Sequence, residues 1–393
     1  MHLPESVKAL IDQLNKNGHR ADVVGGCVRD FLLGKAPYDY DITTDATPDE
    51  MLEIFRDFRT VPTGIKHGTL TVMLNGAPYE ITTYRRDGEY LDHRHPDAVT
   101  FTAKISDDLS RRDFTVNAIA YNPTDGFTDL FDGQADVKAH IIRAVGDPYR
   151  RFDEDALRIL RAARFSATLG FEIEKGTATA AHELAHLLSF VSGERIYTEV
   201  KKLMSGPGAY CVLREHRPII EAALGIKDYT LPDQMRFAAC DASVRFFSLF
   251  AGYDNPTEIF GSVCDRLKVD NALRDSGIAV LSNLTRTLEC AADVKLCLRD
   301  IGVDNTYTLS WARSLLGIPG TCIHCHVESI LEHGEAYTVG QLVIGGRDLL
   351  ALGYRGRAVG EVLEFLLTSV INGDLANERE QLLNTAKLYT PHG

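Results

Sequence analysis

Short apolar runs alternate with polar turns over roughly the first 145 residues of the chain. Apolar and β-branched residues dominate ADVV at 21–24, GTLTVML at 68–74 and YEITTYR at 79–85. Runs of this length and composition, bounded by turn residues, are typical of β-strands. The chain opens differently, because the apolar residues from 7 to 14 recur at the spacing of one helix face. The pattern therefore predicts an N-terminal helix followed by a strand-rich region.

The pattern becomes helical from Asp153 onward. Ala156, Leu157, Leu160 and Ala163 lie three and four residues apart, which predicts a helix with one apolar face. Most of the remaining chain shows the same period, interrupted by Gly, Pro and Asn at turns. The pattern thus predicts an α+β protein, with a mixed α/β head at the N-terminus and a long all-helical region after it.

The composition is that of an ordinary globular protein. Of 393 residues, 45% are hydrophobic and 25% are charged, and the length suits two or three domains. No apolar run reaches the roughly 18 residues of a membrane span, and the N-terminus lacks the basic start and apolar core of a signal peptide. We therefore expect a cytoplasmic protein without membrane contact. The net charge of −13 argues against a protein that coats nucleic acid nonspecifically, but it leaves room for a local basic groove.

Eight cysteines are scattered along the chain and do not form the framework of a small disulfide-rich protein. Cys322 and Cys325 have a CxxC spacing that suits half of a zinc site. A structural zinc site needs about four ligands, and no second ligand pair lies nearby in the sequence. We therefore expect ordinary reduced thiols at these two positions.

Two carboxylates, Asp39 and Asp41, stand one residue apart in a strand-like run. On a strand they point to the same face, where two unpaired carboxylates repel each other unless a cation lies between them. Mg²⁺ prefers carboxylate oxygens and substrate phosphates, so the pair suits metal-dependent phosphoryl or nucleotidyl transfer. The plain alternative is a turn with capping aspartates.

A glycine turn precedes these carboxylates. Gly25 and Gly26 end an apolar run and permit close approach of a ligand to the backbone, and the helix expected next offers N–H groups to a phosphate. Arg29 adds a positive charge that can hold phosphate oxygens, although a surface arginine after a plain turn is the alternative. The chain contains neither a P-loop nor a GxGxxG motif. The segment therefore predicts a different kind of phosphate site beside a metal site.

These residues resemble the first motif of the class II tRNA nucleotidyltransferase and poly(A) polymerase family, in the DNA polymerase β superfamily. The motif reads GGxVRDxLLG followed by DxDxxT, and the chain has GGCVRDFLLG followed by DYDITT. The resemblance implies a polymerase-β-like nucleotidyltransferase head with a mixed sheet. It also implies that Gly26 and Arg29 hold the triphosphate and that Asp39 and Asp41 are the catalytic ligands of magnesium ions.

The segment RRDFTVNAIAY resembles a second motif of the family. It contains Arg111 and Arg112, of which the resemblance implies that one reaches the nucleotide and the other is structural. Asp113 follows and can pair with either arginine. Glu80, on a neighbouring strand, is a candidate for a third carboxylate at the metal site, with a solvated strand residue as the alternative.

The segment DEDALRILRAARF resembles a third motif. On a helix, Asp155, Arg158, Arg161 and Arg164 lie three residues apart along one face. An exposed, salt-bridged helix face is the common alternative. The resemblance implies that Asp155 and Arg158 recognise the incoming base and that Arg161 and Arg164 support the triphosphate.

The resemblance also divides the chain into parts. It implies a catalytic head at 1–140 and a helical neck for nucleotide recognition at 141–204. A helical body at 205–300 and a helical tail that binds tRNA at 301–393 follow. The stretch from 346 to 380 resembles the family's tail, whereas the body contains nothing that we can match. The polar segment 86–101 lies where CCA-adding members have a flexible loop that acts in the switch from CTP to ATP.

The resemblance thus implies an enzyme that adds C, C and A to the tRNA 3′ end from CTP and ATP with Mg²⁺, and we expect no obligatory protein partner. A poly(A) polymerase shares the head motifs but usually carries basic extensions, whereas this chain is acidic. An enzyme that adds only CC or only A is a second alternative. A non-catalytic RNA-binding protein is a third, and the intact carboxylate pair argues against it.

Overall fold

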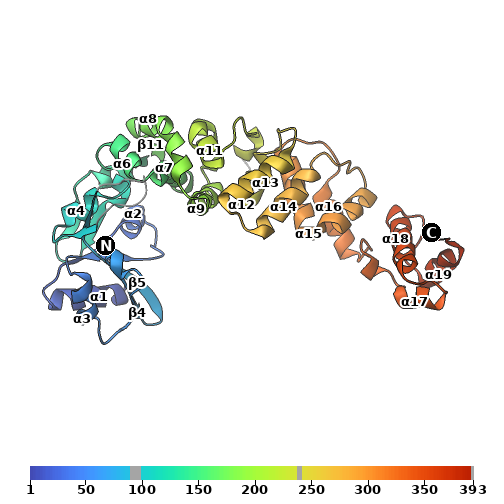
Figure 1. Ribbon diagram of the computed structural model, residues 1–393, viewed down its shortest axis with the longest axis horizontal. Helices are drawn as coiled ribbons and strands as arrows, with labels where there is room; N and C mark the ends of the chain where they lie inside the picture. The colour runs from blue at the N-terminus through green and yellow to red at the C-terminus, as the bar shows by residue number, and fades with distance from the viewer. Residues whose placement is uncertain (89–98, 237–240, 391–393) are drawn as a thin grey trace. The chain divides into compact units, whose positions relative to one another are not determined.

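The computed structural model describes residues 1–88, 99–236 and 241–390. The chain forms two compact units, an N-terminal unit of Met1–Asp228 and a C-terminal unit of Tyr229–Gly393 (Figure 1). The boundary falls inside the segment 205–300, and the finer division into head, neck, body and tail stays a prediction.

A seven-stranded mixed sheet lies at the centre of the head. Its strand order is β3–β4–β5–β2–β1–β8–β9, and of these neighbours only β2 and β5 are parallel. The order places β1 and β2 side by side at the middle of the sheet, so that the glycine turn after β1 meets the start of β2. The strands are β1 (Ala21–Val24), β2 (Asp41–Thr44), β3 (Arg59–Val61), β4 (Thr69–Leu74), β5 (Ala77–Thr83), β8 (Ile119–Asn122) and β9 (Gly126–Asp129).

Short helices accompany the sheet. The expected N-terminal helix is α1 (Glu5–Lys16), which buries Val7, Leu10, Ile11 and Leu14. The other helical segments here are α2 (Gly26–Leu32), α3 (Pro48–Ile54), η1 (Ile65–His67), α4 (Ile105–Ser110), η2 (Thr115–Asn117) and α5 (Gly133–Ala139). A separate ladder joins β6 (Arg85–Asp87) to β7 (Val99–Phe101). Most of the loop predicted at 86–101 lies outside the described residues.

The helical pattern predicted from Asp153 onward is interrupted at Asp155. Helix α6 (Pro148–Glu154) ends there, and α7 (Leu157–Leu169) begins two residues later. Asp155 is extended, with φ −139°, and its carboxylate accepts a hydrogen bond from the Leu157 N–H at 3.1 Å. Asp155 therefore precedes the helix that was expected to contain it, whereas the three arginines that follow it lie within α7.

The rest of the N-terminal unit is helical apart from one short parallel ladder between β10 (Ile141–Ile142) and β11 (Glu172–Ile173). Helix α7 packs against α9, α10 and α11, and its apolar side is buried along its whole length. The expected α+β architecture, a mixed-sheet head followed by a helix-rich remainder, is confirmed. The helical segments after α7 are α8 (Lys175–Glu183), η3 (Ala185–Phe190), α9 (Gly193–Met204), α10 (Ala209–Glu215) and α11 (Arg217–Leu224).

The C-terminal unit is built from helices in its described part. Four phenylalanines, Phe246, Phe247, Phe250 and Phe260, pack edge to face at its core. Its longest helix has a kink at Gly302, where φ is 79° and only glycine is free of strain. The segments are η4 (Asp233–Arg236), α12 (Ala242–Ser248), α13 (Pro256–Leu267), α14 (Asn271–Ser282), α15 (Ala291–Leu315), α16 (Ile323–Glu332), η5 (Val339–Gln341), α17 (Gly346–Ala351), α18 (Arg357–Asn372) and α19 (Arg379–Leu388).

No helix within the described ranges is both long enough and apolar enough to cross a membrane.

Candidate nucleotide and metal site

The two carboxylates of the DxD pair lie at the start of β2 rather than together on it. Asp41 is the first residue of the strand and pairs with Val24 of β1, whereas Asp39 lies in the loop before it. The pKa of Asp41 is above its ordinary value, because surrounding protein removes water from it and because Asp39 and Glu80 carry like charges. Arg112 offsets part of this rise. The pair is thus in electrostatic contact, although the expectation that both residues stand on one strand face was wrong.

This arrangement fits a divalent cation. A raised pKa caused by neighbouring carboxylates is relieved when a cation binds between them. Glu80 lies on β5, one residue before the Ile81 that pairs with Ile42, so it faces Asp41 across the parallel ladder. Within the described part of the chain, no group of three or more His, Cys, Asp and Glu residues is close enough to hold a metal. Asp39 and Asp41 are therefore the candidate ligands, and Glu80 is a neighbour that changes their charge.

The glycine turn brings the backbone of the head close to Arg112 of the second motif. Gly25 has φ 82°, and its N–H donates to the carbonyl of Ile119 in β8 at 3.2 Å. A Cβ atom at Gly25 would lie 3.3 Å from Nη1 of Arg112. A larger residue here would be strained and would displace that guanidinium. Gly26 begins α2 directly beside this point.

Arg29 is held on α2 by two polar partners. Its Nη2 donates to Asp30 at 2.7 Å and its Nη1 donates to Asn117 at 2.6 Å, and only 8% of the residue is exposed. Asn117 lies in the second motif, but nothing in the sequence distinguishes it from its neighbours. Its amide places Arg29 next to Asp113, to which Asn117 donates at 3.3 Å.

Arg111 and Arg112 both bind the fully buried Asp108. Arg111 donates to Oδ1 at 2.7 Å and Arg112 donates to Oδ2 at 3.0 Å. Burial alone would raise the pKa of Asp108, but the two guanidinium groups outweigh it and the pKa is lowered. Arg112 also has a buried Nε without a hydrogen-bond partner among the described residues, and its charge acts on Asp41. An unpaired buried donor beside the DxD pair is a ready contact for an anion.

A buried ion pair connects the second motif to α7. Asp113 accepts hydrogen bonds from Arg161 Nε at 2.9 Å and from the Phe114 N–H at 2.8 Å. Burial would raise the pKa of Asp113, but Arg161, Arg158 and Asn117 more than offset it, and the pKa falls to about 2. Asp113 therefore pairs with Arg161 across the fold, and not with the adjacent arginines of its own motif as the sequence suggested.

Three arginines surround the ring of Phe165 on α7. The guanidinium carbons of Arg164, Arg161 and Arg29 lie 3.5, 5.3 and 5.5 Å from the ring centroid. Glu199 of α9, which is 5% exposed, accepts a hydrogen bond from Arg164 Nε at 2.8 Å. Cations stacked on an aromatic face and paired with a buried carboxylate have few alternative positions. The structure thus brings together Arg29, Arg161 and Arg164, whose predicted role at the triphosphate stays a prediction.

Asp155 and Arg158 do not bind each other. Asp155 accepts from Arg195 Nη2 at 3.0 Å, whereas Arg158 donates to Glu154 at 3.0 Å and to the carbonyl of Arg111 at 2.9 Å. The Asp155 carboxylate accepts three hydrogen bonds, two from Arg195 and one from the Leu157 N–H, and it has roughly four acceptor positions. The Arg158 guanidinium also donates to the Arg151 carbonyl, so it makes three hydrogen bonds and has five donors. Each side chain therefore keeps capacity for a further partner.

Arg195 and Glu199 of α9 were missed by the sequence analysis. They lie four residues apart, which is a recognisable spacing on a helix, but nothing in the sequence indicates that they meet α7. Arg195 also has a buried Nη1 without a hydrogen-bond partner among the described residues. Both residues act on the predicted site through the side chains that they position.

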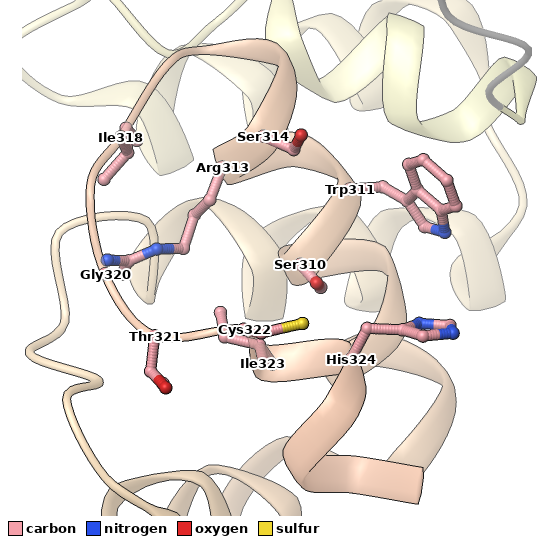
Figure 2. A pocket seen from close by; sticks show the side chains of 10 residues that line it. All are labelled: Ser310, Trp311, Arg313, Ser314, Ile318, Gly320, Thr321, Cys322, Ile323 and His324. Atoms are coloured by element: carbon pink, nitrogen blue, oxygen red, sulfur yellow. The ribbon is translucent and has the colours of Figure 1, made fainter.

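A pocket of 450 Å³ lies in the C-terminal unit, between the end of α15 and the start of α16. Figure 2 shows the rings of Trp311 and His324 side by side at one edge, with Arg313 turned toward the loop at Gly320. Arg313 donates to the carbonyls of Leu284 and Pro319 at 3.1 and 2.8 Å and is 6% exposed. This arginine is therefore structural, and the pocket contains none of the predicted site residues.

The CxxC pair lies beside this pocket. Cys322 and Cys325 form a disulfide, so the expectation of reduced thiols at these positions was wrong. The two residues are one helical turn apart at the start of α16, which brings their Cα atoms within 5.4 Å. Five other described cysteines are free, and the described residues contain no cluster for a zinc ion here.

Comparisons with known proteins identify the family of this chain. A family model described as "Poly A polymerase head domain" matches residues 21–143, and another described as "Probable RNA and SrmB- binding site of polymerase A" matches residues 170–215. The CCA-adding enzymes of Limosilactobacillus fermentum and Geobacillus thermodenitrificans are each 35% identical to this chain. The first match covers 97% of this chain and 96% of the relative, and the second covers 95% and 94%.

A solved structure is similar over nearly the whole chain. The crystal structure of the Bacillus stearothermophilus CCA-adding enzyme in complex with CTP has 30% sequence identity and a TM-score of 0.73. The match covers 98% of this chain and 97% of that one. The glycine turn, the DxD pair and the arginines of α7 thus lie in a chain that matches its relatives from end to end, and this chain belongs to the CCA-adding enzyme family.

Proposed function

We propose that this protein adds C, C and A to the 3′ end of tRNA from CTP and ATP and releases pyrophosphate at each step, without a nucleic-acid template. The observation that carries the proposal is the convergence of Gly25, Arg112 and Asp41 at the junction of β1 and β2. It places the buried Nε of Arg112, which has no hydrogen-bond partner among the described residues, beside a carboxylate pair, in a chain that is similar to CCA-adding enzymes over its whole length.

Enzymes of this family use a divalent metal ion, and we propose Mg²⁺ held by Asp39 and Asp41. When bound, the ion lowers the cost of the charge that develops on the attacking and leaving oxygens. Asp39 and Asp41 supply the carboxylate oxygens, and Glu80 adds negative charge beside them. The ladder between β2 and β5 fixes the distance between Asp41 and Glu80.

The triphosphate is assigned to Gly26, Arg29, Arg112, Arg161 and Arg164. Of the two arginines of the second motif, Arg112 is favoured because its Nε has no partner and its Nη1 faces the glycine turn. Arg111 has the structural role, since it binds Asp108 and its carbonyl accepts from Arg158. Fixed guanidinium groups bind phosphate oxygens without a large loss of side-chain entropy.

The base is assigned to Asp155 and Arg158. Cytosine and adenine both present an amino donor beside a ring-nitrogen acceptor, whereas uracil and guanine present a carbonyl acceptor beside a ring N–H donor. A carboxylate only accepts and a guanidinium only donates. Together, Asp155 and Arg158 can match the first pattern and oppose the second. Arg195 positions Asp155, and Glu154 positions Arg158.

The partners follow from this activity. They are the tRNA acceptor end, CTP and ATP, and we propose a cytoplasmic location without an obligatory protein partner. The division into head (1–140), neck (141–204), body (205–300) and tail (301–393) also stays a proposal. So does the role of the segment 86–101 in the switch from CTP to ATP.

Incubation with labelled CTP or ATP, Mg²⁺ and tRNAs ending at the discriminator base, at C or at CC tests this function. We expect the first two tRNAs to receive C from CTP and the third to receive a single A from ATP. The double variant Asp39→Ala/Asp41→Ala is the matched control and should add nothing while still binding tRNA. Long A tracts would instead indicate a poly(A) polymerase, addition of only C or only A would indicate a specialist, and no addition would indicate an RNA-binding protein.

A further inference from the structure

A strongly basic pocket of 780 Å³ lies in the N-terminal unit, between α2, α7 and α9. Five of its lining side chains are cationic and only one is acidic. Arg29 and Arg164, two of the proposed triphosphate residues, form one wall, and the acidic residue, Asp30, is already bound by Arg29 at 2.7 Å. The three remaining cations, Lys35, Lys201 and Lys202, have no role in the site described above.

One face of α9 points into this pocket. Thr198, Lys201, Lys202 and Ser205 are three, four and seven residues apart, and all four line the pocket. The opposite face of α9 is buried and includes Glu199, the partner of Arg164. The same helix therefore positions a proposed triphosphate arginine with its inner face and presents two lysines with its outer face.

The three lysine side chains have no ion-pair partner among the described residues. Among residues 1–88, 99–236 and 241–390, none forms an ion pair or a hydrogen bond with the side-chain ammonium of Lys35, Lys201 or Lys202, and all three residues are exposed. Like charges that share a pocket repel one another and lower stability unless an anion is present. Lysines at the end of a helix also stabilise its C-terminus, and Lys35 lies just after α2, but that effect does not require lysines of two different helices to line one pocket.

We propose that this pocket binds backbone phosphates of the tRNA acceptor end next to the bound nucleotide. The inference rests on the proposed function, because it names the part of the RNA substrate that occupies the pocket. RNA is favoured over a second part of the triphosphate because Lys201 and Lys202 lie within residues 170–215, which match a model of an RNA-binding segment. Flexible lysines also suit a moving phosphodiester chain, whereas the rigid arginines suit a fixed triphosphate.

The test compares tRNA binding by the full-length parent enzyme and by the double variant Lys201→Gln/Lys202→Gln. A fluorescently labelled tRNA ending in CC is titrated at several KCl concentrations, and the Kd is measured by anisotropy without nucleotide. We expect about a tenfold weaker Kd at 0.1 M salt and a slope of log Kd against log salt that is smaller by about 1 to 2. Lys35→Gln should shift both quantities in the same direction.

Two controls separate this role from helix stability and general charge. Lys16→Gln/Lys138→Gln removes two exposed lysines of the same unit that lie outside the pocket, and it should leave the Kd and the salt slope unchanged. Lys201→Arg/Lys202→Arg keeps the charge and should restore binding. A melting temperature lowered without a change in Kd or slope would show that the lysines only stabilise the end of α9, and the proposal would then be wrong.

A second readout distinguishes RNA from nucleotide. The KM for CTP, measured with saturating tRNA, should stay within about twofold of the parent value. A large rise in this KM with an unchanged tRNA Kd would assign the pocket to the triphosphate and overturn the proposal. The anisotropy titration needs no nucleotide addition, so a parent that binds tRNA but adds no C or A would contradict the proposed function alone.

Discussion

Arg111 and Arg112 are adjacent in the chain and bind opposite oxygens of Asp108, yet their remaining surroundings differ. Arg112 faces the glycine turn with an unpaired buried Nε, whereas the backbone carbonyl of Arg111 is tied to Arg158. The sequence presented the two residues as equivalent. The difference between them comes from tertiary contacts, with the glycine turn for Arg112 and with α7 for Arg111, which local sequence does not specify.

The first prediction compares these two arginines. Arg112→Gln should lower kcat/KM for CTP by about 100-fold, because a charge-assisted contact to a phosphate contributes about 2 to 3 kcal/mol. Arg111→Gln serves as the matched variant and should cost less than about tenfold by the same reasoning. Single-turnover kinetics with a tRNA ending at the discriminator base measure both effects. Equal losses in the two variants would contradict the assignment.

The second prediction concerns base choice. Asp155→Ala and Arg158→Ala should each lose selection for C and A more than they lose nucleotide binding, because unpaired buried polar groups can reject an analogue by about 10⁴-fold. Incorporation of all four nucleotides by each variant is the measurement. If UTP and GTP remain excluded as strictly as in the parent enzyme, base choice lies elsewhere and these residues only anchor α7.

At the scale of elements, α7 is the helix on which the site is assembled. Its arginines reach Asp113 of the second motif, Glu154 of α6 and Glu199 of α9. Periodicity in the sequence predicted the helix and the face on which Arg158, Arg161 and Arg164 lie. It could not predict the break at Asp155 or the partners on other elements, because those depend on which helices pack against α7 and not on local spacing.

The third prediction follows from the link between Asp113 and α7. The pKa of Asp113 is about 2 in the folded protein, below its ordinary value of 3.8, so the ion pair stabilises the fold fully above about pH 4. This contribution, about 2 kcal/mol, should disappear as the pH falls from 4 toward 2. The variant Asp113→Asn has no titrating carboxylate at this position. The difference in unfolding free energy between the parent and Asp113→Asn should therefore become smaller as the pH falls from 4 toward 2.

Urea unfolding at pH 6, 4 and 2.5, followed by circular dichroism, measures this difference. Asp30→Asn is a suitable control, since Asp30 is also paired with an arginine but is less buried. A difference between parent and Asp113→Asn that stays constant with pH would show that Asp113 gives no ionic stabilisation.

At the scale of the whole molecule, the proposed nucleotide residues all lie in the N-terminal unit, Met1–Asp228. The resemblance rests on short motifs that are local in sequence, so it could be read without knowledge of the packing. The internal organisation of the helical C-terminal unit was not predictable in the same way. Its core depends on contacts among Phe246, Phe247, Phe250 and Phe260, and apolar periodicity alone does not identify partners.

The fourth prediction uses this division. A fragment of residues 1–228 should bind CTP with a Kd within about threefold of the parent, since no proposed nucleotide ligand is removed. Its affinity for tRNA should fall by more than about tenfold, because part of the RNA-binding surface is lost. Isothermal titration for CTP and anisotropy for tRNA measure the two constants, with circular dichroism as the check that the fragment is folded. Equal loss of both affinities would contradict the prediction.

The chain of hydrogen bonds from Arg29 through Asn117 and Asp113 to Arg161 has a consequence for how the sequence can change. A substitution at any one of these residues leaves a buried neighbour without its hydrogen-bond partner, which costs several kcal/mol of stability. Selection therefore removes such single substitutions before a compensating change can arise. We therefore expect these four residues to change together rather than singly among related chains.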